Sequence, residues 1–265
     1  MKKVFLWDDS FAILGLKEGD SMENLYLRTL KLRQLPAEDW LAALPAVRHL
    51  AAQPLELDSP VTFFVGENGS GKSTLLEAIA VHQGFNPEGG TRNMLFSTAD
   101  SHSGLWENLV IARGSARPRD GFFLRAESYY NLASYLDRLE SEQSGLLNSY
   151  GGTSLHRQSH GESFLAAVEN RFGDQGLYLL DEPEAALSPT RVLRLMAQMH
   201  RLVQHSSQFI ICTHSPMLMA FPGATVLEIT ENGIAKVPYE QTEHYQITRE
   251  FLNRPERMLQ YLLGE

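Results

Sequence analysis

A run of small and polar residues early in the chain has the composition of a phosphate-binding loop. The run comprises Gly66, Glu67, Asn68, Gly69, Ser70, Gly71, Lys72, Ser73 and Thr74. Its three glycines allow the backbone to turn so that successive N–H groups face phosphate oxygens. Lys72 supplies a mobile positive charge, and Ser73 supplies a hydroxyl ligand for Mg²⁺. We therefore expect this run to bind the phosphates of a nucleotide together with magnesium.

Two adjacent acids later in the chain have the side chains that phosphoryl transfer needs. Asp181 follows the apolar residues 177–180, so it should end a buried strand, where α/β proteins place their ligands. Its carboxylate would hold Mg²⁺ directly or through water. Glu182 comes next and would lie near the γ-phosphate as the general base for an attacking water. The pair predicts hydrolysis of ATP.

A histidine ends another apolar run. His214 follows residues 209–212, which are typical of a buried strand. Parallel strands that end side by side would bring His214 to the same phosphates, where its imidazole could bond the γ-phosphate and orient Glu182 or the water. The expected catalytic residues are Glu182, His214 and Lys72.

The elements that must position these residues alternate between strand and helix. The apolar run 61–65 precedes the glycine loop as a strand, and 74–80 follows it as a helix. Further strands are expected at 25–32, 106–112, 177–181, 208–213, 224–229 and 233–239, and further helices at 36–53, 190–204 and from 240 to the end. This alternation predicts an α/β fold with a mostly parallel sheet and helices on both faces.

Length and composition suit one soluble domain. The chain has 265 residues, of which 43% are hydrophobic, and we expect an N-terminal arm at 1–23 and a single domain at 24–265. The formal net charge of −9 disfavours a surface built for nucleic acid. The one cysteine, Cys212, lies in an apolar run and is interpreted as a core residue. No stretch approaches the eighteen or so apolar residues of a membrane span, so we expect a cytoplasmic protein without direct membrane insertion.

The order of these motifs, completed by the run 158–163, resembles the ATP-binding cassette ATPases and in particular their soluble SMC-like branch. Ser159, Gly161 and Glu162 match a signature loop of that family, although His160 replaces a glycine. The resemblance implies a P-loop NTPase, an ABC-type ATPase head with a small helical subdomain at about 122–172. It also implies a head-to-tail homodimer that forms on ATP binding, in which Ser159, Gly161 and Glu162 contact the partner's nucleotide. The segment between Lys72 and Ser159 is too short for the coiled coil of SMC proteins, so the chain is expected to be a bare head.

The sequence does not determine some features of the family, or the client, meaning the molecule on which the ATPase would act. A glutamine that normally links Mg²⁺ to the helical subdomain is missing, and Glu127 is the candidate replacement, with Arg125 second. Tyr26 is a possible adenine-stacking residue but equally suits strand packing. The function expected is an ATP-driven switch acting on DNA or on an unidentified protein partner. The alternative is the cytosolic ATPase subunit of a membrane transporter.

Overall fold

The computed structural model describes residues 25–92, 94, 103–125, 129–142, 145 and 160–264. The expected arm at 1–23 and most of the segment 91–102 lie outside these residues. The strands are β1 (Leu27–Leu32), β2 (Leu55–Glu56), β3 (Val61–Gly66), β4 (Leu109–Arg113), β5 (Asp120–Arg125), β6 (Gly176–Asp181), β7 (Gln208–Cys212), β8 (Thr225–Thr230) and β9 (Gly233–Lys236).

Helices connect most of these strands. The α-helices are α1 (Asp39–Ala43), α2 (Pro45–Ala52), α3 (Lys72–His82), α4 (Leu105–Asn108), α5 (Tyr129–Glu142), α6 (His160–Arg171), α7 (Pro189–Gln204), α8 (Pro216–Met219), α9 (Glu243–Asn253) and α10 (Pro255–Leu263). Two short 3₁₀ helices are η3 (Pro183–Ala186) and η4 (Tyr239–Gln241).

The central sheet has the strand order β5-β6-β7-β3-β8-β9. The pairings from β5 through β8 are all parallel, and only β9 runs antiparallel, beside β8. A second, antiparallel sheet has the order β2-β1-β4. The mixed α/β fold with a mostly parallel sheet is therefore confirmed.

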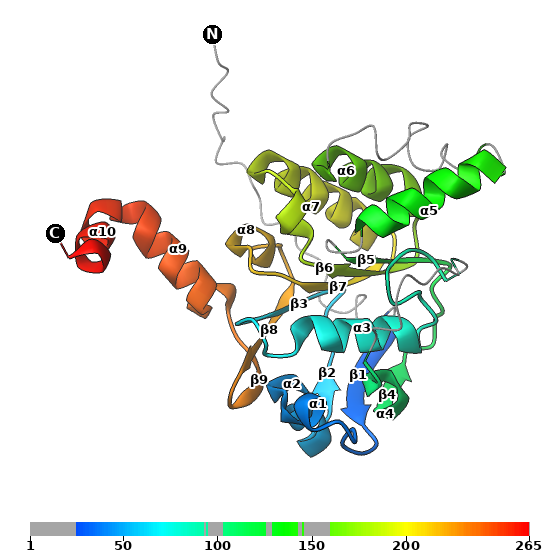
Figure 1. Cartoon of the computed structure of the whole chain (residues 1–265), viewed down its shortest axis with the longest axis horizontal. Helices are drawn as coiled ribbons and strands as arrows, with labels where there is room; N and C mark the ends of the chain where they lie inside the picture. Colours follow the sequence, from blue (N-terminus) through cyan, green and yellow to red (C-terminus); the bar gives the residue numbers. More distant parts are fainter. Residues whose placement is uncertain are drawn as a thin grey trace, which may run out of the picture.

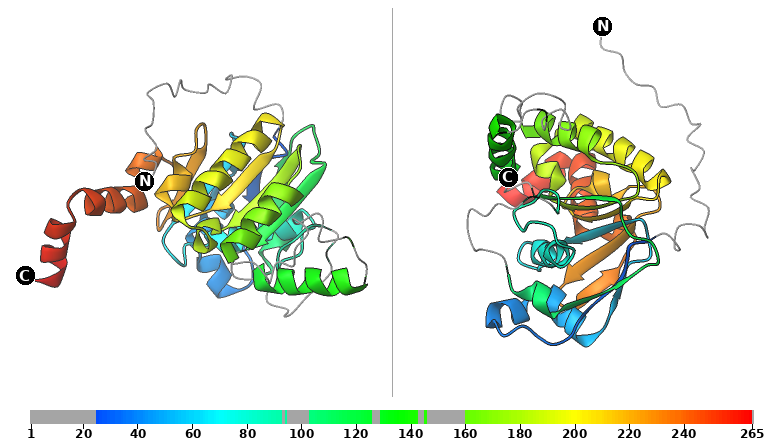
Figure 2. Two further views of the ribbon diagram at one scale, coloured as in Figure 1. Left: turned by 90° about the horizontal axis from the view of Figure 1, so that it is seen from above. Right: turned by 90° about the vertical axis from the view of Figure 1, so that its right-hand side faces the viewer.

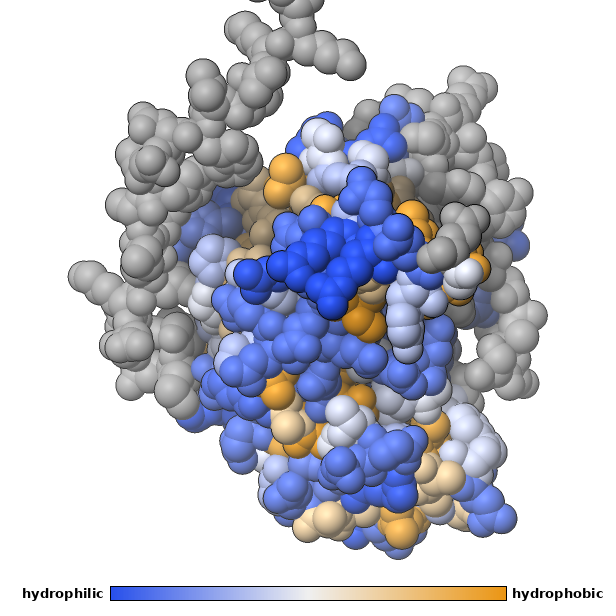
Figure 3. All heavy atoms as spheres, turned by 90° about the vertical axis from the view of Figure 1, so that its left-hand side faces the viewer, coloured by the Kyte–Doolittle hydropathy of each residue, from blue (hydrophilic) through white to orange (hydrophobic). Residues whose placement is uncertain are grey.

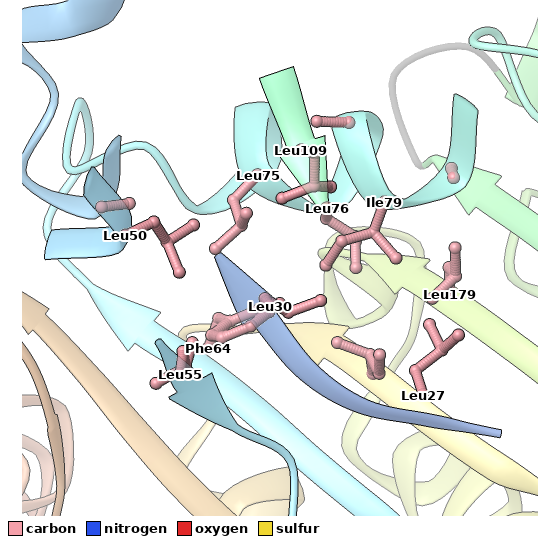
Figure 4. Close-up of a cluster of buried hydrophobic side chains, with 14 of the residues drawn as sticks. Leu27, Leu30, Leu50, Leu55, Phe64, Leu75, Leu76, Ile79, Leu109 and Leu179 are labelled. Atoms are coloured by element: carbon pink, nitrogen blue, oxygen red, sulfur yellow. The ribbon is translucent and has the colours of Figure 1, made fainter. Parts of the chain in front are cut away.

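Side chains alternate between two cores on the two faces of the central sheet. On β6, Tyr178 and Leu180 belong to one core, whereas Leu177 and Leu179 belong to the other. The first core is completed by α6, α7 and α8, and the second by α2, α3 and the small sheet (Figure 1). Figure 4 shows the second core, in which leucines of β1 and α3 meet Phe64 of β3. Strands buried on both faces read as continuous apolar runs, which explains the pattern in the sequence.

Several elements differ from their predicted bounds. The predicted helical region at 122–172 begins with a strand, because residues 122–125 belong to β5 at the edge of the parallel sheet. A short apolar run does not distinguish strand from helix by periodicity. The predicted strand at 106–112 begins as α4 and becomes β4 only at Leu109. The predicted helix at 36–53 is divided because Leu44 is extended before Pro45, a residue that disfavours helix in its predecessor.

The two C-terminal helices extend away from the body of the molecule (Figure 2). No residue of α9 or α10 is buried, and their exposed apolar side chains are Ile247, Phe251, Leu252, Leu259, Tyr261, Leu262 and Leu263. Seen from the side on which these helices project, the face is mainly hydrophilic with scattered hydrophobic patches (Figure 3). Among the described residues, no helix has both the length and the hydropathy to cross a membrane.

Candidate functional site

The glycine loop joins the end of β3 to the start of α3, at the carboxyl edge of the parallel strands. Gly66 ends β3 with φ +140°, and a Cβ there would lie 2.3 Å from the carbonyl oxygen of Ile229 on β8. Gly71 precedes α3 in the left-handed conformation, with φ +96°. Both positions require glycine, since side chains rarely adopt these angles and the neighbouring strand leaves no space at Gly66. The loop therefore directs the first N–H groups of α3 toward the sheet edge.

Lys72 is buried at the base of this loop. Its Nζ donates hydrogen bonds to the carbonyl oxygens of Gly66 at 2.7 Å and Glu67 at 2.8 Å. Burial lowers the pKa of Lys72, an effect that Cys212 and the carboxylates of Asp181 and Glu182 oppose. The ammonium group is thus held by the loop itself, beside the two acids predicted to act with it.

The predicted magnesium pair is brought together across the sheet. Ser73 Oγ donates a hydrogen bond of 2.9 Å to Asp181 Oδ1, although 108 positions separate the two residues. Asp181 is buried, and the Nε of Arg125 lies 3.7 Å from its other oxygen. Arg125 Nη1 also donates to Glu77 Oε2 at 2.7 Å. A hydroxyl and a carboxylate at this distance provide two oxygen ligands of the kind that Mg²⁺ prefers.

Glu77 had no predicted role. It lies on α3, where its Oε1 accepts a hydrogen bond from the backbone N–H of Ser103 at 3.0 Å. Together with the Arg125 contact, this places a second buried carboxylate behind Asp181. The feature of the sequence that could have indicated a role for Glu77 is its position as a single acid within the apolar residues of α3.

Glu182 stands on a strained turn directly after β6. Its φ of +48° is in the left-handed region, which is uncommon for a residue with a side chain. The turn is held by a hydrogen bond from the Glu182 N–H to Cys212 O and by the following Pro183, at the start of η3. Such strain is characteristic of functional positions. Here it leaves the Glu182 carboxylate 41% exposed at the sheet edge, 3.5 Å from His214 Nε2.

Glu184 fixes the backbone that carries His214. Its Oε1 accepts hydrogen bonds from Thr213 Oγ1 at 2.7 Å and from the His214 N–H at 2.6 Å. Burial and the nearby Lys72 lower the pKa of His214, while Glu182 opposes them. The sequence placed Glu184 in the loop after Glu182 but did not indicate this contact, which depends on the β6–β7 pairing.

A second histidine completes the cluster. His244, in the first turn of α9, has its Nε2 2.8 Å from His214 Nδ1. It also lines a cavity of 390 Å³ that runs beside the phosphate loop, past Glu228 and Asn232. No pattern in the sequence connected the C-terminal helices with the site.

The described part of the signature run lies against the segment that follows the two acids. A Cβ at Gly161 would lie 2.5 Å from Ala186 O, so the start of α6 packs directly on η3. Glu162 pairs with Arg191 of α7 at 3.0 Å. Ser159, predicted to contact the partner's nucleotide, and Glu127, predicted as a magnesium ligand, lie outside the described residues.

Tyr26 is not placed to stack on a nucleotide. Its N–H is bonded to Gln208 Oε1 and its hydroxyl to Ser206 O, at the amino end of β7. The phosphate loop lies at the opposite, carboxyl end of the strands. The strand-packing interpretation of Tyr26 is therefore correct.

Cys212 is fully buried, and burial raises the pKa of its thiol well above the usual value, so it is a core residue.

The residues at this edge fit a nucleoside triphosphate with magnesium. Ser70 Oγ is buried and has no hydrogen-bond partner within the described part of the chain. A Cβ at Gly69 would meet nothing within 4 Å, so the loop is open at that point. An orphaned hydroxyl, the N-terminus of α3, an ammonium group and the Ser73–Asp181 pair are complementary to phosphate oxygens and a divalent cation.

The strand, glycine loop, helix and parallel sheet form the arrangement of a P-loop fold. Residues 46–100 match the family described as the AAA domain. This is the class of protein that the resemblance to cassette and SMC-like ATPases predicts. A comparison with curated protein sequences gives no match.

Solved structures of two kinds resemble the chain. One is cbiO1 from Clostridium perfringens, part of the ABC transporter complex cbiONQ, with 16% identity, a TM-score of 0.47, and coverage of 91% of this chain and 100% of that one. Another is the SMC head domain from Thermotoga maritima, with 17% identity, a TM-score of 0.43, and coverage of 81% and 99%. A third is an SmcHead bound to the C-winged helix domain of ScpA, with 14% identity, a TM-score of 0.45, and coverage of 82% and 99%.

Proposed function

We propose that the protein binds ATP with Mg²⁺ and hydrolyses it to ADP and phosphate. The observation that carries the proposal is the 2.9 Å hydrogen bond between Ser73 and Asp181, beside a buried Lys72 and the Glu182–His214 pair. These groups come from the start of α3, from the end of β6 and the residue after it, and from the segment after β7, and they meet at one edge of the sheet.

Each side chain has a separate task in this mechanism. The N–H groups at the start of α3 and the Lys72 ammonium group neutralise the charge of the phosphates. Phosphate oxygens would then take the place of the carbonyl oxygens of Gly66 and Glu67 as hydrogen-bond acceptors of Lys72. Ser73 and Asp181 would hold Mg²⁺, which supplies charge stabilisation for the phosphoryl group. Glu182 accepts a proton from the attacking water, and His214 orients Glu182 and the water.

Hydrolysis is tested with purified protein and two variants. Lys72→Ala should abolish Mg²⁺-dependent phosphate release, because the loop loses its only lysine beside the acids. Lys31→Ala is the matched control, since Lys31 is exposed on β1, and it should leave the rate unchanged. Equal hydrolysis by the Lys72→Ala and Lys31→Ala proteins would show that the glycine loop is not the active site.

We also infer that two chains form a head-to-tail homodimer when ATP binds. Support comes from Gly161, whose contact with Ala186 brings the start of α6 to the segment after Glu182, at the same sheet edge. In this arrangement Ser159, Gly161 and Glu162 complete the partner's site. Glu182→Gln should trap the dimer, and light scattering at saturating ATP and Mg²⁺ measures it. A monomer under these conditions would remove the shared-site mechanism.

The client of the switch is proposed to be DNA or a protein partner in the cytoplasm. Three exposed arginines, Arg113, Arg117 and Arg119, precede β5 at the amino edge of the sheet, opposite the phosphate loop. DNA binding at such a cluster would weaken steeply with salt. Fluorescence anisotropy with labelled duplex and the Glu182→Gln protein tests it, and an ATP-independent or absent signal at low salt favours a protein client.

A further inference from the structure

The contact between His214 and His244 joins the C-terminal helix α9 to the site. The His214 Nδ1 and His244 Nε2 atoms are 2.8 Å apart, and the ring centroids are 4.8 Å apart. His244 is fixed in the first turn of α9, whose cap residue Thr242 is fully buried and accepts a hydrogen bond from the Tyr245 N–H. The short contact is therefore built on a defined backbone.

The direction of this hydrogen bond follows from the other nitrogen of His214. A bond between two imidazoles requires one ring to donate and the other to accept. His214 Nε2 faces Glu182 Oε1 at 3.5 Å, and an ionised carboxylate only accepts. This nitrogen is buried and makes no hydrogen bond with a described residue, so Glu182 acts on it through charge alone: a proton on Nε2 would face the carboxylate favourably, whereas a lone pair would be repelled. In that neutral tautomer Nδ1 is the acceptor. The donor is the Nε2–H of His244.

The charge state of both rings agrees with this assignment. Burial, followed by the positive charge of Lys72, lowers the pKa of His214. Burial also lowers the pKa of His244, with further contributions from His214 and Lys72, while Glu243 and Glu228 oppose them. Near neutral pH both rings are uncharged, and their hydrogen bonds select the tautomer. The opposite tautomer of His214 would aim a lone pair at the Glu182 carboxylate.

We propose that His244 is a positioning residue for ATP hydrolysis: its Nε2–H bond to His214 Nδ1 keeps the His214 Nε2–H directed at Glu182 and the attacking water. This inference rests on the proposed function. It is needed because the 3.5 Å contact with Glu182 is too long to hold the ring, and Glu184 secures only the backbone N–H of His214.

A packing role alone does not account for His244. Its Nδ1 is buried and has no hydrogen-bond partner among the residues that the structure describes. Burying an unpaired polar nitrogen costs free energy, so an apolar side chain would pack there at lower cost. Within the described part of the chain, the Nε2 of His244 is the ring atom that makes a hydrogen bond, and its partner is His214 Nδ1.

The matched variants are His244→Gln and His244→Leu. A glutamine amide N–H can replace the Nε2–H donor, whereas leucine fills similar space without one. We expect His244→Leu to lower kcat at least about tenfold with KM for ATP changed less than about threefold, and His244→Gln to retain kcat within about threefold. Nitrogen-15 NMR of the imidazoles is the second readout. In the unmodified protein His214 should be protonated at Nε2, and in His244→Leu it should become a mixture of tautomers.

Each outcome decides the proposal. It is overturned by a His214 that is protonated at Nδ1 in the unmodified protein, or by a His244→Leu protein with unchanged kcat and tautomer. Equal loss of kcat in both variants, at an unchanged unfolding temperature, would assign His244 to packing. If His244→Leu does not fold, the spectra of the unmodified protein and of His244→Gln still decide the donor. Absence of any hydrolysis by the unmodified protein refutes the proposed function separately, since the tautomer is read without ATP.

Discussion

Replacing Glu184 tests whether the site depends on a carboxylate that never contacts the nucleotide in our proposal. Its Oε1 accepts two hydrogen bonds, from the Thr213 hydroxyl at 2.7 Å and the His214 N–H at 2.6 Å. Thr213 is fully buried, so Glu184→Ala leaves its hydroxyl without this acceptor and removes the partner of the His214 N–H. Leaving a buried donor unsatisfied costs about 1–3 kcal/mol, which gives a loss of about 3 kcal/mol in the free energy of unfolding.

Glu184→Gln is the matched comparison. Its amide oxygen can accept both hydrogen bonds, and only the charge is lost, so we expect a cost of about 1 kcal/mol. A 1 kcal/mol change moves the midpoint of thermal unfolding by about 2–4 °C in a chain of this size. The expected decrease is thus about 6–12 °C for alanine and about 2–4 °C for glutamine. Glu256→Ala, at an exposed position on α10, should change stability by less than about 0.5 kcal/mol.

Thermal unfolding and phosphate release are measured on the same samples. Because the His214 backbone loses its anchor, Glu184→Ala should also lower kcat at least about tenfold at a temperature where the protein is folded. Glu184→Gln should retain most of the activity. If the alanine and glutamine variants unfold at the same temperature and hydrolyse ATP equally, the two hydrogen bonds do not position His214 and the reasoning is wrong.

Two further predictions concern the stability of the fold, one at the glycine loop and one at the opposite edge of the sheet. Gly66→Ala should destabilise the protein by more than about 3 kcal/mol, because its Cβ would lie 2.3 Å from Ile229 O at a φ of +140°. Gly69→Ala, at a φ of +82° with open space around the Cβ, should destabilise it by about 1–2 kcal/mol. Urea unfolding compares the two variants, and equal unfolding midpoints would contradict the predicted clash at Gly66. Although burial alone would raise it, the Gly173 N–H and Arg171 lower the pKa of Asp120 below its usual 3.8. Its stabilisation is therefore present above the unfolded pKa and is lost as the pH falls through the lower pKa of the folded protein, so Asp120→Asn should be less stable at pH 7, and the difference should shrink as the pH falls below the folded pKa. A constant difference at all pH values would show that the carboxylate charge is not involved.

The sequence was sufficient to predict the glycine loop between β3 and α3 and the central strands. Glycines at 66, 69 and 71 followed by Lys72 and Ser73 have a local meaning, because the loop conformation is determined within a few residues. The buried strands β3, β6 and β7 could also be predicted, because each is a continuous apolar run in the sequence. Asp181 and Glu182 could be placed at a strand end for the same reason, and parallel pairing then implied that His214 ends nearby.

Where a local pattern was ambiguous, prediction failed. Residues 122–125 were assigned to a helical region although they form β5, because a short apolar run is compatible with either element until its neighbour is known. Tyr26 was a candidate for stacking on the nucleotide only because its strand end could not be located from the sequence.

The contacts that support the site depended on the tertiary structure. Glu77 reaches Arg125, Glu184 reaches His214, and His244 reaches the same ring from α9, each across a large separation in sequence. No periodicity records such pairs, because a carboxylate or imidazole acquires its partner only when separate elements pack at the same sheet edge. The sequence by itself therefore determined the residues of the proposed nucleotide-binding site, whereas the packing of β5, η3 and α9 decided which side chains hold those residues in place.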